Sequence, residues 1–303
     1  FREVIGHFDP HVVYCWMHHA ILLGRVSAFL EPRKRAVVTS FRSERSPSST
    51  AVRTGLKLSR WVDTVSIAVS TRVAKQVCRE GLAVHSRVRV IPNGVDTSEF
   101  RPAAGKRDIT RHQLGIPGDT FLFTALGRLE EAKGYGVLLK SFAEVIAVLP
   151  GARLAIAGEG SERHTLEMQI NSLGLENTVK LLGHVDDPRH ILAASDCHVL
   201  PSLWEGMPNS ILEAMSCGVL CVASDVGGVR DVITDGQTGY VVPPGRDHCL
   251  ARVLVDVATA SASHRKIMGI KGRQRIVDAF SIESLVAANA CLLQECYEIA
   301  CRR

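Results

Sequence analysis

The sequence lacks long hydrophobic runs. Nothing in its 303 residues approaches the ~18 consecutive apolar residues that a membrane-spanning helix needs. The richest early run, His19–Leu30, is interrupted by Gly24 and Arg25. We therefore expect no membrane-spanning helix.

Cysteine is present, but not in a pattern typical of disulfides or metal sites. The nine cysteines are odd in number and irregularly spaced, and no Cys-x-x-Cys occurs. This argues against a disulfide framework, a zinc site and thioredoxin chemistry. No Asp-x-Asp occurs either, so we expect no metal and no other cofactor. Free, mostly buried thiols are typical of a reducing compartment, and we expect a cytoplasmic protein.

Strong charge of one sign is also lacking. The net charge is +5, and the basic residues are spread, with the densest clusters at Glu31–Arg35 and Ser40–Arg45. These clusters form either a solvated face or a surface that meets an anionic partner, such as acidic lipid or an anionic substrate. No recognition helix, zinc spacing or aromatic ribonucleoprotein motif occurs, so nucleic acid is not an expected partner.

Short apolar runs do alternate with helical patterns, and the length allows about two domains. From Thr120 onward this alternation predicts a doubly wound parallel sheet followed, from about Asp247, by two or three helices. The expected strands are 120–126, 153–158, 178–183, 197–202 and 219–224, and the expected helices are 136–150, 161–174, 187–195 and 209–218.

A shorter α/β alternation fills the first ninety residues. We expect strands at 10–16, 35–41, 64–70 and 87–96 and helices at 18–30 and 71–81. The segment 97–118 carries Pro102, Gly105, Pro117 and Gly118 and has no core-grade apolar run, so we place the interdomain connection there. Two α/β domains would leave a cleft at the carboxyl ends of their strands, where open sheets bind ligands.

Charged and Gly-rich loops follow the strands of the second domain. In "GRLEEAKG", Gly127 allows a tight turn, and Arg128 and Lys133 project from a loop that enters a helix, which suits a diphosphate. The alternative is an ordinary charged surface loop. The loop at Gly158 could wall a nucleotide or be a plain turn, and a flat base could rest at Val185. Neither a nicotinamide motif nor a P-loop occurs.

Two glutamates lie in "LWEGMPNSILEAM", after another expected strand. Glu205 lies on the loop and Glu213 about one turn into the helix. A carboxylate on the loop can accept hydrogen bonds from sugar hydroxyls, and one on the helix from a ribose. Backbone N–H groups of residues 207–210 could receive phosphate. The alternative is two solvated glutamates, which the Gly-rich loop of 227–245 makes less attractive.

Taken together, "VIPNGVD", "GRL…KG", "GEG", "LGHV", "PSLWEGMPNSILEAM" and "GGVRDVI…GYVVPPG" resemble GT-B glycosyltransferases of glycosyltransferase family 4. The resemblance implies two Rossmann-like domains facing a cleft and retaining transfer from a nucleotide-activated sugar without a catalytic metal. We expect residues 1–105 as a partial acceptor-side domain, 106–280 as the donor domain, and 281–303 as a helix that packs back on the first domain.

The resemblance also implies residue roles. Arg128 and Lys133 would bind the donor diphosphate beside Gly127, Glu205 would hold the donor sugar, and Glu213 would bind the ribose hydroxyls. Backbone groups near sugar and phosphate would come from Gly206, Met207, Pro208 and Asn209.

The acceptor side departs from the family pattern. Members of the family often carry His-x-His before "HANLLGR", and here Trp16 stands where the second His is expected. His19 is the remaining candidate for a catalytic, acceptor-side role, with a buried capping histidine as the alternative. Because sequence that looks like mid-domain begins at Phe1, we expect an incomplete N-terminal domain.

The leading hypothesis is a retaining glycosyltransferase with a UDP-sugar favoured over a GDP-sugar and a lipid-linked or polysaccharide precursor as acceptor. It would work in the cytoplasm or at the inner face of a membrane. Two alternatives stay open. A sugar-nucleotide epimerase of the same fold would need further acid–base residues, and a donor-binding remnant would bind UDP without turnover.

Overall fold

The computed structural model describes residues 2–31, 35–103 and 105–302. Its contacts divide the chain into two compact units. The first unit comprises Phe1–Gly94, Glu205–Met207 and Ile282–Arg303, and the second comprises Val95–Trp204 and Pro208–Ser281. The division falls just before the segment 97–118, in which the connection was expected.

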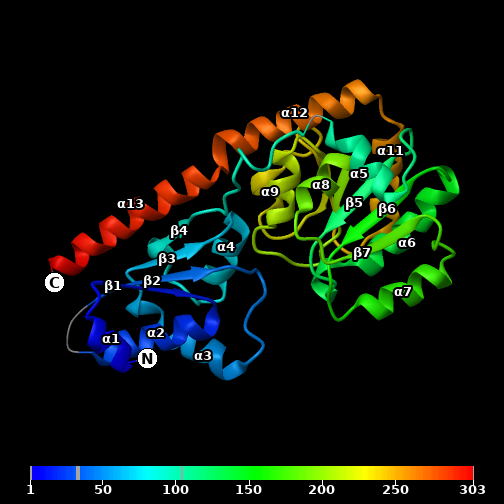
Figure 1. The fold of residues 1–303 in the computed structure, drawn as a ribbon. Coiled ribbons are helices and arrows are strands. Elements are labelled where there is room, and N and C mark those ends of the chain that lie inside the picture. The colour runs from blue at the N-terminus through cyan, green and yellow to red at the C-terminus, as the bar shows by residue number, and fades with distance from the viewer. Residues whose placement is uncertain (1, 32–34, 104, 303) are drawn as a thin grey trace. The chain divides into compact units, whose positions relative to one another are not determined.

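A parallel four-stranded sheet forms the first unit, in the order β1 (Val12–Trp16), β2 (Ala36–Phe41), β3 (Val65–Ala68) and β4 (Val88–Val90). Helix α13 (Ile282–Cys301) contacts β1 and β2, and its Leu292 and Cys296 share a core with Val38 and Ile67. The other helices are α1 (Arg2–Phe8), α2 (His18–Leu30), α3 (Thr50–Ser59) and α4 (Thr71–Arg79). Figure 1 shows α13 and α2 on opposite faces of this sheet.

The second unit is built on a six-stranded parallel sheet in the order β10-β9-β8-β5-β6-β7. Its core gathers Phe123, Phe142 and Leu154 around the central strands. The strands are β5 (Leu122–Leu126), β6 (Arg153–Ala157), β7 (Val179–Gly183), β8 (Cys197–Leu200), β9 (Leu220–Ser224) and β10 (Tyr240–Val242). The helices are α5 (Lys106–Leu114), α6 (Tyr135–Val148), α7 (Arg163–Ser172), α8 (Pro188–Ala194), α9 (Asn209–Ser216), α10 (Val229–Val232), α11 (Asp247–Thr259) and α12 (Ala262–Ala279).

The strands expected from apolar runs are confirmed within about two residues at each end, with one exception. The predicted strand 87–96 is wrong in length, because β4 ends at Val90, shortly before Pro92, which has no N–H to donate to a ladder. The helix expected from Ser161 begins at Arg163, and its N-cap is Glu162 without a side-chain capping bond.

Helix α5 lies in the segment where no structural element was expected. Its sequence, KRDITRHQL, is polar, and a buried Arg111 anchors it in place of an apolar stripe. The Arg111 Nη2 lies 2.6 Å from Asp196 Oδ2, and its other nitrogens donate to main-chain carbonyls, including those of Ala194 and Thr120. Apolar periodicity cannot reveal a helix that is held by such a network.

Candidate active site

The strand order of the second unit defines a switch point between β5 and β8. From β5 the chain moves outward to β6 and β7, and then returns to β8 and moves outward the other way to β9 and β10. Loops that leave the carboxyl ends of β5 and β8 therefore diverge and open a crevice, which is where open α/β sheets bind ligands. Both loops were singled out from the sequence.

The loops after β5 and β6 run backbone against backbone. Gly127 N donates to Ala157 O (3.0 Å) and Leu129 N to Glu159 O (2.8 Å). A Cβ on Gly158, whose φ is +148°, would lie 1.9 Å from Gly127 O. Glycine is therefore required at Gly158, and the floor of the crevice presents main chain rather than side chains.

Two cations follow β5, in different surroundings. The Arg128 side chain is 76% exposed and forms an ion pair with Glu130 at 2.5 Å. Lys133 is half-buried. Its side chain lies beside the end of β5, since a Cβ added to Gly127 would be 3.3 Å from the Lys133 Cε atom. Lys133 is thus the better placed of the two to act in a partly desolvated site.

A histidine that the sequence analysis missed lies beneath this region. His198 on β8 is fully buried, its Nδ1 lies 3.4 Å from Thr124 Oγ1, and its Nε2 has no partner among the described residues. Burial first, and the positive charge of Lys133 second, lower the pKa of His198 to about 3, so the ring is neutral. A polar residue inside the apolar run CHVL was the signal that could have revealed it.

Helix α9 carries Glu213 on its second turn. Its carboxyl is half-buried, and no described residue forms an ion pair or a side-chain hydrogen bond with it. Burial raises the pKa of Glu213, as expected for a carboxylate without compensating donors. Pro208 precedes the helix as its N-cap, and Asn209 is exposed at the first position. Glu213 is therefore open to a ligand that brings hydrogen-bond donors.

Glu205, Gly206 and Met207 belong to the first unit by their contacts. Glu205 N donates to Glu44 Oε1 (3.2 Å), and Glu44 N donates to Glu205 O (3.1 Å). A Cβ on Gly206 would lie 1.9 Å from the main-chain oxygen of Arg42.

Asn93, which belongs to an expected Asn-Gly turn, donates from Nδ2 to Met207 O at 3.2 Å. The contacts of Arg42, Glu44 and Asn93 with the loop 205–207 were not predicted from the sequence. Residues so far apart in the chain leave no local pattern that would indicate their contact.

The remaining predicted positions lie at strand ends of their own units. Val185 is half-buried after β7, and Gly158 N donates to Gly183 O nearby (2.8 Å). His19 is exposed on the first turn of α2. The interpretation of His19 as a buried capping residue is wrong, because the N-cap is Met17, with no side-chain capping bond.

Arg42 and Arg35, one from each of the two basic clusters, make different contacts. The Trp16 ring is half-exposed, and the Arg42 guanidinium lies 5.0 Å from its centroid. Of the cluster Glu31–Arg35, residues 32–34 lie outside the described residues. Arg35 is buried and forms an ion pair with Asp9 at 3.0 Å, so it does not belong to a solvated face.

Among the residues that the structure describes, no three His, Cys, Asp or Glu side chains gather closely enough to hold a metal ion. The nine cysteines are unpaired. No described helix combines the length and the hydrophobicity that crossing a bilayer requires.

Each of the two α/β units is built on a parallel sheet, and the sheet of the second unit has a crevice at its switch point. These features define the class of the fold, which is GT-B. The chain matches the family model "Glycosyl transferases group 1" over residues 106–275, and residues 1–99 match "Glycosyltransferase Family 4". The protein therefore belongs to the GT-B glycosyltransferases of family 4, as its motifs predicted.

Individual relatives agree with this assignment. The UDP-Gal:alpha-D-GlcNAc-diphosphoundecaprenol alpha-1,3-galactosyltransferase of Escherichia coli is 32% identical over 233 residues, which are 74% of this chain and 60% of that protein. The lipopolysaccharide core biosynthesis glycosyltransferase LpsE of Rhizobium meliloti is 32% identical, over 68% of this chain and 57% of LpsE. The chain thus spans about three fifths of these relatives. HepE of Anabaena, solved with UDP, has the same fold, with a TM-score of 0.88 at 23% identity over 97% of this chain and 81% of HepE.

Proposed function

We propose that the protein is a retaining glycosyltransferase that moves a sugar from a UDP-sugar to a lipid-linked precursor. The observation that carries this proposal is Glu213, a half-buried carboxylate without a described partner on a helix that follows the switch-point strand β8. Burying a carboxylate without donors costs stability, so its position is explained best by a ligand that supplies them. The two hydroxyls of a ribose are such donors.

Arg128 and Lys133 would bind the diphosphate of the donor. Both follow β5, whose neighbour in the sheet is β8. Lys133, half-buried at the strand end, is suited to stabilise charge that develops on the departing diphosphate. The main-chain floor around Gly158 leaves room for a nucleotide to approach, and Val185 would lie against its base.

The reaction needs few protein groups. The acceptor hydroxyl attacks the anomeric carbon on the face from which UDP leaves, the bond from that carbon to the diphosphate oxygen breaks, and the diphosphate takes the acceptor proton. The configuration is retained because both events occur on one face. Glu205 would orient the sugar, and His19 is the candidate for the acceptor side. No metal is needed when two cations neutralise the diphosphate.

The donor and acceptor classes rest on the relatives. The Escherichia coli relative is named for UDP-Gal and for a diphosphoundecaprenol acceptor, and HepE was crystallised with UDP. We therefore favour UDP over GDP and a lipid-linked acceptor over a soluble polysaccharide.

We also propose a peripheral contact with a membrane through the first unit. Val26, Phe29 and Leu30 of α2 are 45–60% exposed, and the Phe29 ring meets that of the exposed Trp61 at 5.2 Å. Lys57 and Arg60, which shortly precede Trp61 in the sequence, are exposed basic residues. Exposed aromatic and aliphatic side chains beside basic ones suit an anionic bilayer surface. Cosedimentation with phosphatidylglycerol vesicles, lost in Phe29→Ser/Trp61→Ser, would support the contact.

Isothermal titration with UDP, paired with an assay of UDP-glucose hydrolysis, tests the proposed function. Saturable UDP binding with slow hydrolysis would support it. Binding without turnover would favour a donor-binding protein that lacks transfer activity, and the absence of any UDP binding would refute the proposal.

A further inference from the structure

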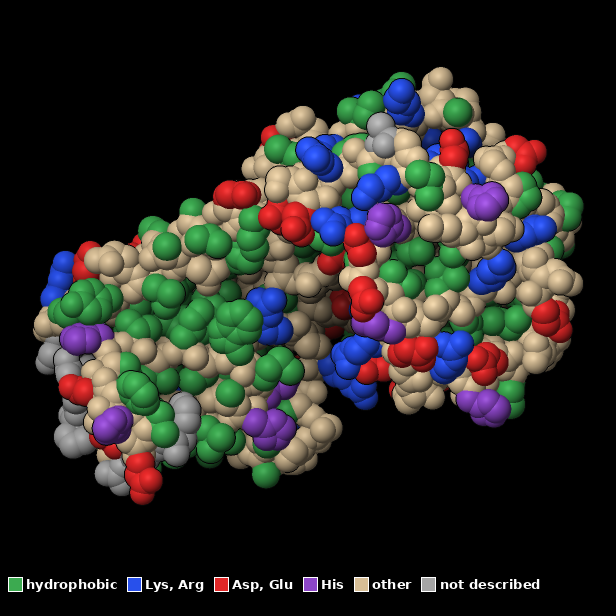
Figure 2. Space-filling model, viewed as in Figure 1, with side chains coloured by type: hydrophobic (Ala, Val, Ile, Leu, Met, Phe, Trp, Pro, Cys, Tyr) green, Lys and Arg blue, Asp and Glu red, His purple; other side chains and the backbone are tan. Residues whose placement is uncertain are grey.

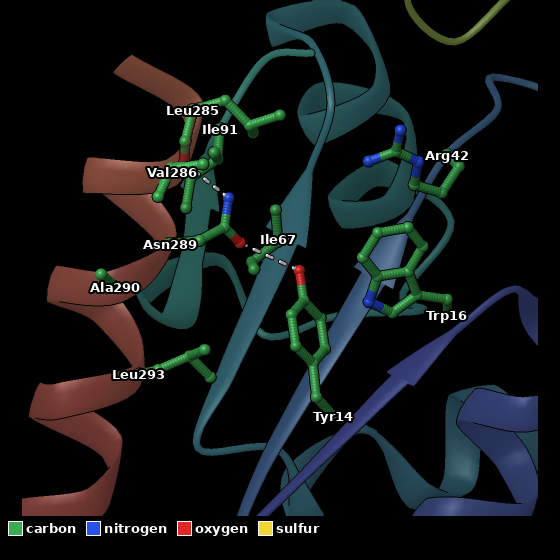
Figure 3. A pocket seen from close by; sticks show the side chains of 10 residues that line it. All are labelled: Tyr14, Trp16, Arg42, Ile67, Ile91, Leu285, Val286, Asn289, Ala290 and Leu293. Atoms are coloured by element: carbon green, nitrogen blue, oxygen red, sulfur yellow. Dashed lines mark hydrogen bonds between the residues drawn. The ribbon is translucent and has the colours of Figure 1, made fainter. Parts of the chain in front are cut away.

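A cavity of about 450 Å³ lies in the first unit, between α13 and the carboxyl ends of the strands. Tyr14 and Trp16 of β1 line it, as do Arg42 after β2 and several residues of α13 (Figure 3). Its volume is that of a small-molecule pocket. The proposed donor site lies on the strands of the second unit and does not include this cavity.

Apolar side chains form most of the wall of this cavity. Leu285, Val286 and Leu293 of α13 face Ile67 and Ile91 across it (Figure 3). Val286 is 59% exposed, which is unusual for a branched aliphatic residue that a helix turns toward its own sheet. Figure 2 shows hydrophobic side chains gathered on the surface of the first unit along α13.

The polar groups inside the cavity satisfy each other. Tyr14 OH donates to Asn289 Oδ1 at 3.2 Å, and Asn289 Nδ2 donates to Leu285 O at 2.9 Å (Figure 3). These groups therefore offer little to a polar ligand, and an apolar chain can lie against them without leaving a donor unpaired.

Arg42 is the exception, at one side of the cavity. Its guanidinium lies over the Trp16 ring, and Nη2 donates to Asn93 Oδ1 at 2.5 Å. No described carboxylate lies within ion-pair distance of it. Burial lowers the pKa of Arg42, which reflects a positive charge that is partly desolvated and not neutralised. Such a cation favours an anionic ligand, phosphate above all.

We propose that this cavity binds a phosphate-bearing lipid, with the phosphate at Arg42 and the apolar chain between α13 and the strand ends. The proposal deepens the proposed function, on which it rests, by identifying the place and class of the acceptor as a diphosphate-linked isoprenoid. Charge complementarity at Arg42 favours a phosphate head group, and the apolar lining favours a hydrocarbon chain. The diphosphoundecaprenol in the name of the Escherichia coli relative favours an isoprenoid as that chain.

Farnesyl diphosphate is a soluble probe that contains both parts. Titrated into the full chain, it should bind saturably, whereas inorganic diphosphate and farnesol, which each hold one part, should bind at least tenfold more weakly. If farnesol binds as tightly as farnesyl diphosphate, the proposed phosphate contact is wrong. If inorganic diphosphate binds as tightly as farnesyl diphosphate, the proposed contact with the apolar chain is wrong. Lysophosphatidic acid that binds as tightly would overturn the isoprenoid assignment.

Two variants test the residues. Arg42→Met keeps the packing on Trp16 but removes the charge, and Ala290→Phe fills the cavity from α13. Each should weaken farnesyl diphosphate binding by about tenfold or more. Arg45→Met and Ala288→Phe are matched controls at exposed positions that do not line the cavity, and they should bind normally. Equal affinity in Arg42→Met and Arg45→Met would refute the proposal.

UDP titration of the same samples separates this proposal from the function on which it rests. UDP binding should persist in every variant and also shows that each one is folded. Loss of farnesyl diphosphate binding with UDP binding intact would localise the effect to the cavity. A wild-type chain that binds UDP but not farnesyl diphosphate would overturn the lipid site alone, and the reverse result would overturn the donor assignment alone.

Discussion

Arg25 and Asp63 form an ion pair that has no exposure to solvent, with Arg25 Nη2 2.5 Å from Asp63 Oδ2. The Asp63 carboxylate also accepts hydrogen bonds from Thr39 and Ser66, and Arg25 donates to main-chain carbonyls of Leu56 and Leu82. The pair thereby links α2 to β2, α3 and β3, and holds together the unit that carries the proposed lipid site.

Breaking this pair should destabilise the protein strongly. Asp63→Asn leaves a buried guanidinium without its counter-ion, and we expect a loss of about 3–5 kcal/mol in the free energy of unfolding. Urea unfolding measures the effect. Glu298→Gln is the control, because it removes an exposed pair with Arg302 and should change stability by less than about 0.5 kcal/mol. Equal effects of the two substitutions would contradict the structural role of Asp63.

Lys133→Ala and Arg128→Ala should each weaken UDP binding, by about tenfold to a hundredfold for a charge-assisted contact. Lys133→Ala should have the larger effect, because Lys133 is half-buried whereas Arg128 is mostly exposed. Isothermal titration measures both, with Arg252→Ala on an exposed position of α11 as control. Unchanged affinity in both variants would remove the diphosphate assignment.

Glu213→Gln and Glu205→Gln should affect different kinetic constants. A contact from Glu213 to the ribose is made equally in the ground and transition states, so its loss should raise the donor KM and weaken UDP binding. A contact from Glu205 to the transferred sugar changes during the reaction, so its loss should lower kcat and leave UDP affinity nearly unchanged. Steady-state kinetics with UDP titration distinguishes them, and identical behaviour of the two variants would refute the division of roles.

Glu213→Gln should also make the unliganded protein more stable at neutral pH. The pKa of Glu213 is raised in the folded state, so its contribution to stability is present below 4.5, the ordinary pKa of the group, and is lost as the pH rises through the folded pKa. The neutral amide avoids that loss. Melting temperatures of both proteins should therefore converge as the pH falls below 4.5 and separate above it, and a destabilised variant at pH 7 would contradict this account.

Transfer activity should survive EDTA. The proposed site neutralises the diphosphate with Arg128 and Lys133, and the sequence offers no Asp-x-Asp for a divalent cation. Donor turnover is measured before and after chelation. Activity that disappears with EDTA and returns with magnesium or manganese would contradict the metal-free proposal.

The sequence by itself determined the alternation of strands and helices, because period and turn chemistry are local. The apolar runs of β5 and β6 and the helix α2 were predictable within a residue or two, and the loop motifs at Arg128 and Glu213 identified the family. Order along the chain also predicted which loops follow which strands, and hence which residues belong to one edge of a sheet.

Tertiary structure decided whatever depends on distant partners. Arg111 holds helix α5 through Asp196, and the main chain of Glu205 exchanges hydrogen bonds with Glu44. Arg42 lies over Trp16, and no carboxylate in the described part of the chain pairs with it. None of these contacts leaves a periodic signal, because each joins residues that are far apart or lie on different elements. Burial, which sets the charge state of His198 and raises the pKa of Glu213, likewise arises only when the sheet and its helices close around these groups.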